Sequence, residues 1–127
     1  MISEAEVMGF IPTTDAVRAR AFYEDVLGLG VVSDDPFALV LESNGTFIRI
    51  AKLDELTPAP YTILGWRVND IESEVQTLHA RGVTFTRYPG MAQTDLGVWT
   101  APGGAKIGWF RDPDGNVLSL SQHPEGQ

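Results

Sequence analysis

The stretch Ile107-Gly-Trp-Phe-Arg-Asp-Pro-Asp-Gly-Asn-Val-Leu-Ser-Leu-Ser121 places two alternating apolar runs on either side of a turn at 112–116. The turn contains a proline, which presets φ on entry, and a Gly-Asn pair, which tolerates positive φ on exit. The pattern therefore predicts a β-hairpin. A calcium loop is excluded, because its glycine would stand sixth and a glutamate twelfth, whereas here the glycine is fourth and His123 is twelfth.

The composition limits the classes of partner. The chain has 127 residues, 43% of them hydrophobic, which suits one globular domain with its own core. The net charge of -8 disfavours nucleic acid and anionic membranes, so a small molecule is the expected partner. Without cysteines there is no disulfide and no thiol chemistry. No apolar run approaches the roughly 20 residues of a membrane span and the start does not resemble a secretory signal, so we expect a cytoplasmic protein.

The first half of the chain predicts a β-α-β-β-β order. A strand at 7–11 leads into a helix at 16–27, which Thr14 or Asp15 caps and Gly28 ends. Strands follow at 30–33, 37–41 and 46–51, and Ser43-Asn-Gly45 forms the last hairpin turn. Helical spacing predicts that the helix buries Val17, Ala21, Phe22, Val26 and Leu27.

The second half repeats this order. A strand at 62–68 precedes a helix that Asn69 caps, with Glu72 completing a capping box, and that Gly82 ends. This helix is expected to bury Ile71, Val75 and Leu78. Strands at 83–87 and 96–100 and the final hairpin complete the unit. We predict one α+β domain over residues 1–127, with module one at about 5–53, a connector at 54–60 and module two at about 61–122.

Strand alternation assigns each side chain to one of two faces. In the first module Val7, Gly9, Ile11, Ile48 and Ile50 are expected to face the helix, as are Leu64, Trp66, Val68, Leu118 and Leu120 in the second. The residues between them face the other way. The predicted architecture is a pair of βαβββ modules that form a curved mixed sheet around a cleft, with the helices on the convex side.

Two motifs connect this layout with a known family. They are Asp15 followed by Ala21-Phe-Tyr-Glu-Asp-Val-Leu-Gly28, and Phe110-Arg-Asp-Pro-Asp-Gly-Asn-Val-Leu-Ser119. From Val7 to Gln122 the chain resembles the vicinal oxygen chelate superfamily, which includes glyoxalases, bleomycin-resistance proteins and extradiol dioxygenases. The resemblance implies paired modules and a homodimer.

Metal-dependent members of that family hold a divalent ion through four side chains, usually His, Gln or Glu. Counted from Asp15 and Asp70 at the starts of the two helices and from the turn glycines Gly45 and Gly115, the equivalent positions are Met8, Arg49, Ile63 and Ser119. None is a suitable ligand for a hard or borderline ion, and their strand neighbours are no better. His79 is expected on the solvated face of its helix and His123 in the tail. The sequence thus predicts no metal and no cofactor.

The predicted cleft is apolar and aromatic with two cations, which is typical of a small-molecule site. Its expected residues are Met8, Phe10, Phe47, Arg49, Ile63, Arg67, Trp99, Trp109 and Ser119. The two arginines either bind a ligand carboxylate or phosphate, or form internal ion pairs with Glu42 or with an acidic residue of a partner subunit.

Three functions fit these residues. The first is a binding protein that sequesters an apolar or aromatic, possibly anionic, small molecule without turnover. The second is a metal-independent lyase or isomerase, or another enzyme of the superfamily, for which only Tyr61, Tyr88, Glu42 or Ser119 offers acid-base chemistry. The third is a dimeric interaction module whose cleft is filled by its own side chains.

Overall fold

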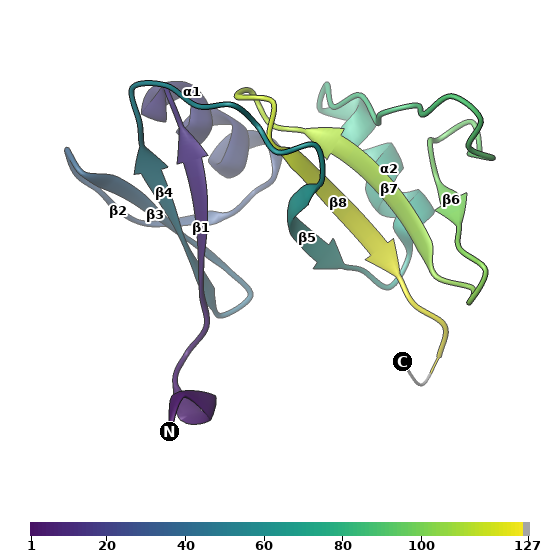
Figure 1. Ribbon diagram of the computed structural model, residues 1–127, viewed down its shortest axis with the longest axis horizontal. Coiled ribbons are helices and arrows are strands. Elements are labelled where there is room, and N and C mark those ends of the chain that lie inside the picture. The colour runs from purple at the N-terminus through teal and green to yellow at the C-terminus, as the bar shows by residue number, and fades with distance from the viewer. Residues whose placement is uncertain (126–127) are drawn as a thin grey trace. The chain divides into compact units, whose positions relative to one another are not determined.

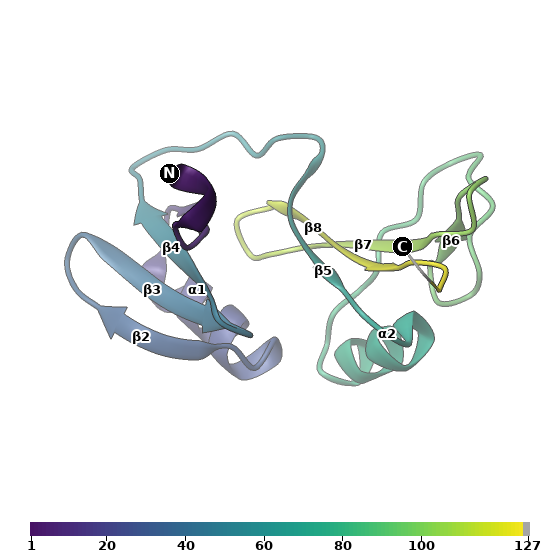
Figure 2. The ribbon, with the colours of Figure 1, turned by 90° about the horizontal axis from the view of Figure 1, so that it is seen from below.

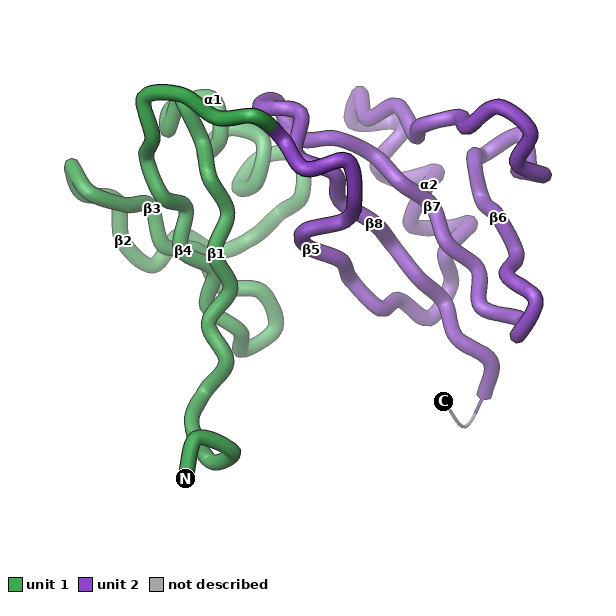
Figure 3. The backbone as a smooth tube through the Cα atoms, viewed as in Figure 1, with its two compact units in different colours: residues 1–57 green, residues 58–127 purple. Residues whose placement is uncertain are grey.

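The computed structural model describes residues 1–125, and its contacts divide the chain into two compact units. Unit 1 is Met1–Thr57 and unit 2 is Pro58–Gln127 (Figure 3). The division falls inside the predicted connector. Each unit has its own four-stranded sheet, so each is described by itself.

Unit 1 has the predicted β-α-β-β-β order (Figure 1). Its elements are the 3₁₀ turn η1 (Ile2–Glu4), β1 (Met8–Thr13), α1 (Ala16–Arg20), the π-helical η2 (Ala21–Val26), β2 (Gly30–Asp34), β3 (Ala38–Ser43) and β4 (Thr46–Lys52). The strand order is β1-β4-β3-β2, with β1 parallel to β4 and the other pairs antiparallel. The helical stretch crosses from the end of β1 to the start of β2 on one face of the sheet.

Alternation along the strands of unit 1 is confirmed. Ile11, Ile48 and Ile50 are buried on the helix side, together with Leu39 and Leu41 of β3. The turn that joins β3 to β4 has positive φ at Asn44 and Gly45, as the Asn-Gly pair predicts. Val7 is an exception, because it precedes β1 and is 77% exposed.

The helix of unit 1 begins as predicted but buries another face. The Asp15 side chain accepts a hydrogen bond from the Arg18 backbone N–H, which confirms the cap. The prediction that Val17 and Ala21 are buried is wrong, because Val17 is 83% exposed while Ala19 and Tyr23 are buried. The stripe 19, 23, 26, 27 also has helical spacing, and it places the large Tyr23 ring in the core.

Unit 2 repeats the topology with strand order β5-β8-β7-β6. Its elements are β5 (Thr62–Arg67), α2 (Ile71–Ala80), β6 (Trp99–Thr100), β7 (Lys106–Arg111) and β8 (Val117–Gln122). As in unit 1, the first and last strands pair in parallel, here β5 with β8. Figure 2 shows α2 on one side of this sheet.

The core of unit 2 forms between α2 and the sheet. Ile71, Val75 and Leu78 are buried, as predicted. The helix contacts β7 and β8, which contribute the buried Phe110, Leu118 and Leu120 to this core. The rings of Trp66 and Phe85 contact Phe110, with centroid distances of 6.5 and 5.1 Å.

Two predictions for unit 2 are wrong in detail. The cap of α2 is Asp70 rather than Asn69, because the Asp70 carboxylate accepts from the Ser73 N–H at 3.2 Å. No strand forms at 83–87, and the strand predicted at 96–100 is reduced to Trp99–Thr100. The loop between α2 and β6 is held by side-chain hydrogen bonds instead. Among residues 1–125 no helix is long and apolar enough to cross a membrane.

Candidate functional site

The face of the unit 2 sheet opposite α2 carries the predicted cleft residues of that module. Ser119 pairs with Trp109 across β7–β8 and with Gly65 across β5–β8, so these three positions share a face. Trp99 pairs with Ile107, two residues from Trp109, and therefore lies on this face too. We call this surface the open face of unit 2.

Three aromatic rings gather on the open face. The centroids of Trp99 and Trp109 are 6.2 Å apart with the rings tilted by 34°. The Tyr88 ring meets Trp109 edge-on at 5.4 Å. All three side chains are only half-buried, whereas Phe110 on the opposite face is fully buried. The cluster therefore leaves aromatic surface accessible to a planar apolar molecule.

Polar groups border this aromatic surface. Ser119 is half-buried beside Gly65, where an added Cβ would lie 2.9 Å from the Ser119 Oγ, so the glycine makes room for the hydroxyl. Arg67, two residues further along β5, is exposed and pairs with Ser121. Within residues 1–125 the Arg67 guanidinium forms no hydrogen bond or ion pair. Ile63 lies at the irregular register between Thr62 and Leu64 and is half-buried.

The structure also places a histidine that sequence reasoning assigned to the tail. The His123 Nε2 atom lies 3.0 Å from the Ser121 Oγ, and Ser121 is on the open face. His123, which the sequence places in the tail, thus lies beside a residue of the open face. The sequence spacing could have indicated this position of His123, since residues 119, 121 and 123 fall on one side of an extended chain.

Unit 1 exposes a second apolar surface on the side of its sheet away from α1. Met8, Phe10 and Phe47 are 40, 63 and 41% exposed, which is unusual for residues within a paired sheet. Arg49 pairs with Phe10 across β1–β4 and is half-buried. We call this surface the open face of unit 1.

The charge of Arg49 has no close partner among the described residues. It forms no hydrogen bond or ion pair with them, and Glu42, the predicted internal partner, accepts instead from the Gly45 N–H at 2.5 Å. The pKa of the exposed Asp35 carboxyl is lowered, chiefly by hydrogen bonds from the Phe37 and Ala38 amides and to a lesser extent by Arg49 and Lys52. Arg49 thus lowers the pKa of Asp35 by its charge alone, without a direct hydrogen bond or ion pair to this carboxylate.

The four positions expected to hold a metal do not fit one. Met8 offers a thioether, Ile63 has no donor atom, Arg49 is a cation and Ser119 is a weak hydroxyl ligand. Within the part of the chain that the structure describes, no group of three or more His, Cys, Asp or Glu side chains could hold a metal ion. No catalytic step can therefore be derived through a metal at these positions.

Comparisons with solved structures support the fold over nearly the whole chain. A superfamily member from Sphaerobacter thermophilus DSM 20745 matches with a TM-score of 0.73 and 28% identity, covering 97% of this chain and 100% of that one. TnmS3, an antibiotic binding protein from Streptomyces sp. CB03234, matches with a TM-score of 0.72 and 22% identity, covering 98% of this chain and 99% of that one. Lactoylglutathione lyase from Agrobacterium tumefaciens matches with a TM-score of 0.72 and 18% identity, covering 94% of this chain and 93% of that one. No curated protein matches the sequence.

The family assignment rests on sequence and fold together. Residues 5–120 match the family model described as Glyoxalase/Bleomycin resistance protein/Dioxygenase superfamily. The match spans both βαβββ units and includes both motifs noted above. The chain therefore belongs to the glyoxalase, bleomycin-resistance protein and dioxygenase superfamily, with the α+β fold expected from its sequence.

Proposed function

We propose that this protein binds an apolar or aromatic small molecule that carries a carboxylate or another anionic group, without a metal and without turnover. The observation that carries the proposal is the cluster of Trp99, Trp109 and Tyr88 beside Ser119 on the open face of unit 2. The rings supply a stacking surface and Ser119 supplies a hydroxyl that donates or accepts a hydrogen bond.

The two arginines give the preference for an anion. Neither Arg49 nor Arg67 has a hydrogen-bonding or ion-pairing partner among residues 1–125. A guanidinium binds a carboxylate through two parallel hydrogen bonds, which adds geometry as well as charge. Met8, Phe10 and Phe47 beside Arg49 repeat on unit 1 the combination of apolar surface and cation that Trp109 and Arg67 provide on unit 2.

A structural neighbour supports a binding role. TnmS3 is an antibiotic binding protein and shares the fold over 98% of this chain. Its 22% identity transfers only the fold, so the ligand class proposed here rests on the side chains of this chain. The exposed Met8, Phe10 and Phe47 form a further apolar surface, which we propose is covered by ligand or by a second copy of the chain in a homodimer.

Fluorescence titration tests the proposal directly. The purified protein is titrated with a panel of aromatic carboxylic acids, aromatic amines and aromatic antibiotics. Binding next to Trp99 and Trp109 changes the tryptophan emission, and we expect saturable quenching by aromatic acids with no chemical change of the ligand. Absence of binding across the panel, or consumption of the ligand, would contradict the proposal.

Variants identify the surface. Arg67→Met and Arg49→Met should each weaken an aromatic acid that contacts them by about 1.5–3 kcal/mol, because a charge-assisted hydrogen bond is lost. Arg81→Met serves as the matched control, since Arg81 is an exposed residue at the end of α2. If Arg67→Met, Arg81→Met and the parent protein have equal affinities, Arg67 does not contact the ligand on unit 2, and the same result for Arg49→Met excludes the open face of unit 1.

A second candidate function, a metal-independent lyase or isomerase, is favoured by one contact. The Ser121 Oγ and the His123 Nε2 lie 3.0 Å apart on the open face, within reach for a proton transfer. Ligand turnover that His123→Gln abolishes while tryptophan quenching persists would support this enzyme over the binding protein.

A further inference from the structure

A separate pocket lies on the other side of unit 2, beside α2. It has a volume of about 260 Å³ and is lined by Val75, His79, Thr84, Phe85, Arg87, Asp95, Leu96 and Gly97. Phe85 locates it on the helix side of the sheet, because its ring approaches the Gly108 backbone and contacts Phe110, which faces α2. The open face is therefore on the opposite surface of the sheet.

The floor of the pocket is apolar and fixed. Phe85 and Val75 are buried at 7 and 1% exposure, and Leu96 is half-buried between them and solvent. Gly97 is buried with φ of 86°, and a Cβ added there would lie 3.1 Å from the Phe85 Cβ. A glycine at 97 therefore lets the loop pass close to the Phe85 side chain.

Side-chain hydrogen bonds, most of them from Gln93, hold the loop that forms the wall. The Gln93 amide donates to the carbonyl oxygens of Thr86 and Gly97 at 2.9 and 3.0 Å, and its oxygen accepts from the Tyr88 N–H at 2.8 Å. The Thr86 N–H also donates to the Trp109 carbonyl of β7 at 2.7 Å. These bonds tie the irregular segment to the sheet, so the pocket exists before any ligand arrives.

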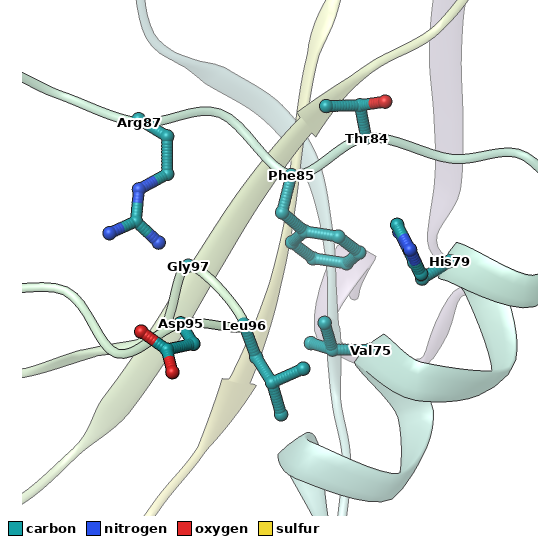
Figure 4. A pocket seen from close by; sticks show the side chains of 8 residues that line it. All are labelled: Val75, His79, Thr84, Phe85, Arg87, Asp95, Leu96 and Gly97. Atoms are coloured by element: carbon teal, nitrogen blue, oxygen red, sulfur yellow. The ribbon is translucent and has the colours of Figure 1, made fainter.

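The rim carries charges of both signs. Figure 4 shows the side chains of Arg87 and Asp95 on one side of the pocket and His79 on the other, with Phe85 and Leu96 between them. One Arg87 Nη donates to the Thr94 carbonyl, which orients the guanidinium, while its other N–H groups stay available. Asp95 is exposed and makes no hydrogen bond or ion pair within residues 1–125.

We propose that this pocket binds a free amino acid with an apolar side chain. Arg87 would take the α-carboxylate, Asp95 would take the α-ammonium, and the side chain would rest on Phe85 and Leu96. A ligand with one charge alone leaves one of these two rim groups unpaired, which favours a zwitterion. The volume lies below the roughly 300–1,000 Å³ of pockets for drug-sized ligands, so an amino acid is the appropriate size.

Calorimetry on the full chain tests the ligand class. The probes are L-phenylalanine, L-leucine, 3-phenylpropionate, which lacks the ammonium, and phenethylamine, which lacks the carboxylate. We expect both amino acids to bind with heat that Arg87→Gln removes, and the Arg87-dependent binding of 3-phenylpropionate and phenethylamine to be at least tenfold weaker than that of L-phenylalanine. Heat that Arg87→Gln leaves unchanged belongs to the open face, which is proposed to bind aromatic acids. Equal Arg87-dependent binding of 3-phenylpropionate, or no Arg87-dependent heat from either amino acid at millimolar concentration, would overturn the proposal.

Variants and chemical shifts test the place. Arg87→Gln and Asp95→Asn alter exposed side chains and should each weaken L-phenylalanine at least tenfold, whereas Arg81→Gln and Asp54→Asn should leave it unchanged. In ¹H–¹⁵N spectra the ligand should shift the amide signals of residues 95–97. Unchanged affinity in both rim variants would refute this site. Shifts confined to the tryptophan side chains of the open face would also refute it, and would instead support the aromatic-acid proposal.

Discussion

The turn at 112–116 offers a stringent test of how unit 2 is held together. The Asp112 carboxylate is 5% exposed and accepts hydrogen bonds from the backbone N–H groups of Asp114 and Asn116 at 3.0 and 2.9 Å and from the Asn116 Nδ2 at 2.9 Å. Asn116 is itself 1% exposed. Replacing Asp112 by alanine removes the acceptor while both Asn116 donors remain buried.

The expected loss follows from these two donors. Loss of a charged acceptor from a buried donor costs about 1–3 kcal/mol, and water can reach the more exposed Asp114 amide. We therefore expect Asp112→Ala to lower the free energy of unfolding by about 3–5 kcal/mol, a large part of the roughly 5–15 kcal/mol that a domain has. Asp112→Asn keeps a weaker acceptor of the same shape and should lose about 1–2 kcal/mol.

Urea unfolding followed by tryptophan fluorescence measures this loss where it occurs, because Trp66, Trp99 and Trp109 all belong to unit 2. With a slope of about 1.5 kcal/mol per molar urea, the midpoint of Asp112→Ala should fall by about 2–3 M. Asp54→Ala in the connector is the control and should not move it. A loss below about 1 kcal/mol in Asp112→Ala would refute the reasoning that these hydrogen bonds stabilise the hairpin.

Three further outcomes are expected. Gly65→Ala should destabilise unit 2 by about 1 kcal/mol, because its Cβ would lie 3.3 Å from the Ser119 carbonyl oxygen and would turn the Ser119 Oγ, 2.9 Å away, to another rotamer, whereas Gly103→Ala, with nothing within 4 Å, should be neutral in the same urea assay. Asp35 should titrate below its ordinary pKa of 3.8 by ¹³C NMR. Because that pKa is lowered, Asp35→Asn should reduce stability at neutral pH, and the difference from the parent should disappear as acid protonates Asp35. Metal analysis of purified protein should find no stoichiometric divalent ion, and one tightly held ion per chain would contradict the assignment of Met8, Arg49, Ile63 and Ser119.

Much of the fold was predictable because turns and caps are encoded locally. Asn44-Gly45, Gly28 and the 112–116 turn each require a backbone conformation that few residues adopt, so their positions fix the strand and helix limits. The face of the first helix was not predictable in this way. Helical spacing allows either Val17 and Ala21 or Ala19 and Tyr23 to form the buried face. Only packing against the sheet selects the face that contains Tyr23.

The candidate site was predictable to the same extent as the strands that carry it. Ser119 and Trp109 were placed correctly on one face because β7 and β8 have regular alternation, and the register pairs them. His123 was missed because it follows β8, where alternation continues beyond the last ladder bond. Whether these residues bind a ligand depends on which groups their side chains already bond to in the fold. Strand alternation in the sequence assigns a side chain to a face but does not give its bonding partners.

The difference between the two units explains why the pocket beside α2 could not be anticipated. The β-branched and aromatic residues at 83–87 predict a strand by propensity alone, yet Pro89, Gly90 and Gly97 interrupt the ladder that such a strand would need. The freed backbone groups must then find other partners. Gln93 supplies three of the bonds, to residues 86, 88 and 97, and a glutamine in a polar loop carries no sequence signal for that role. Replacing the second strand of the module by a loop held in this way leaves Phe85 and Leu96 beside α2 with space between them, which is the space that the proposed amino acid would fill.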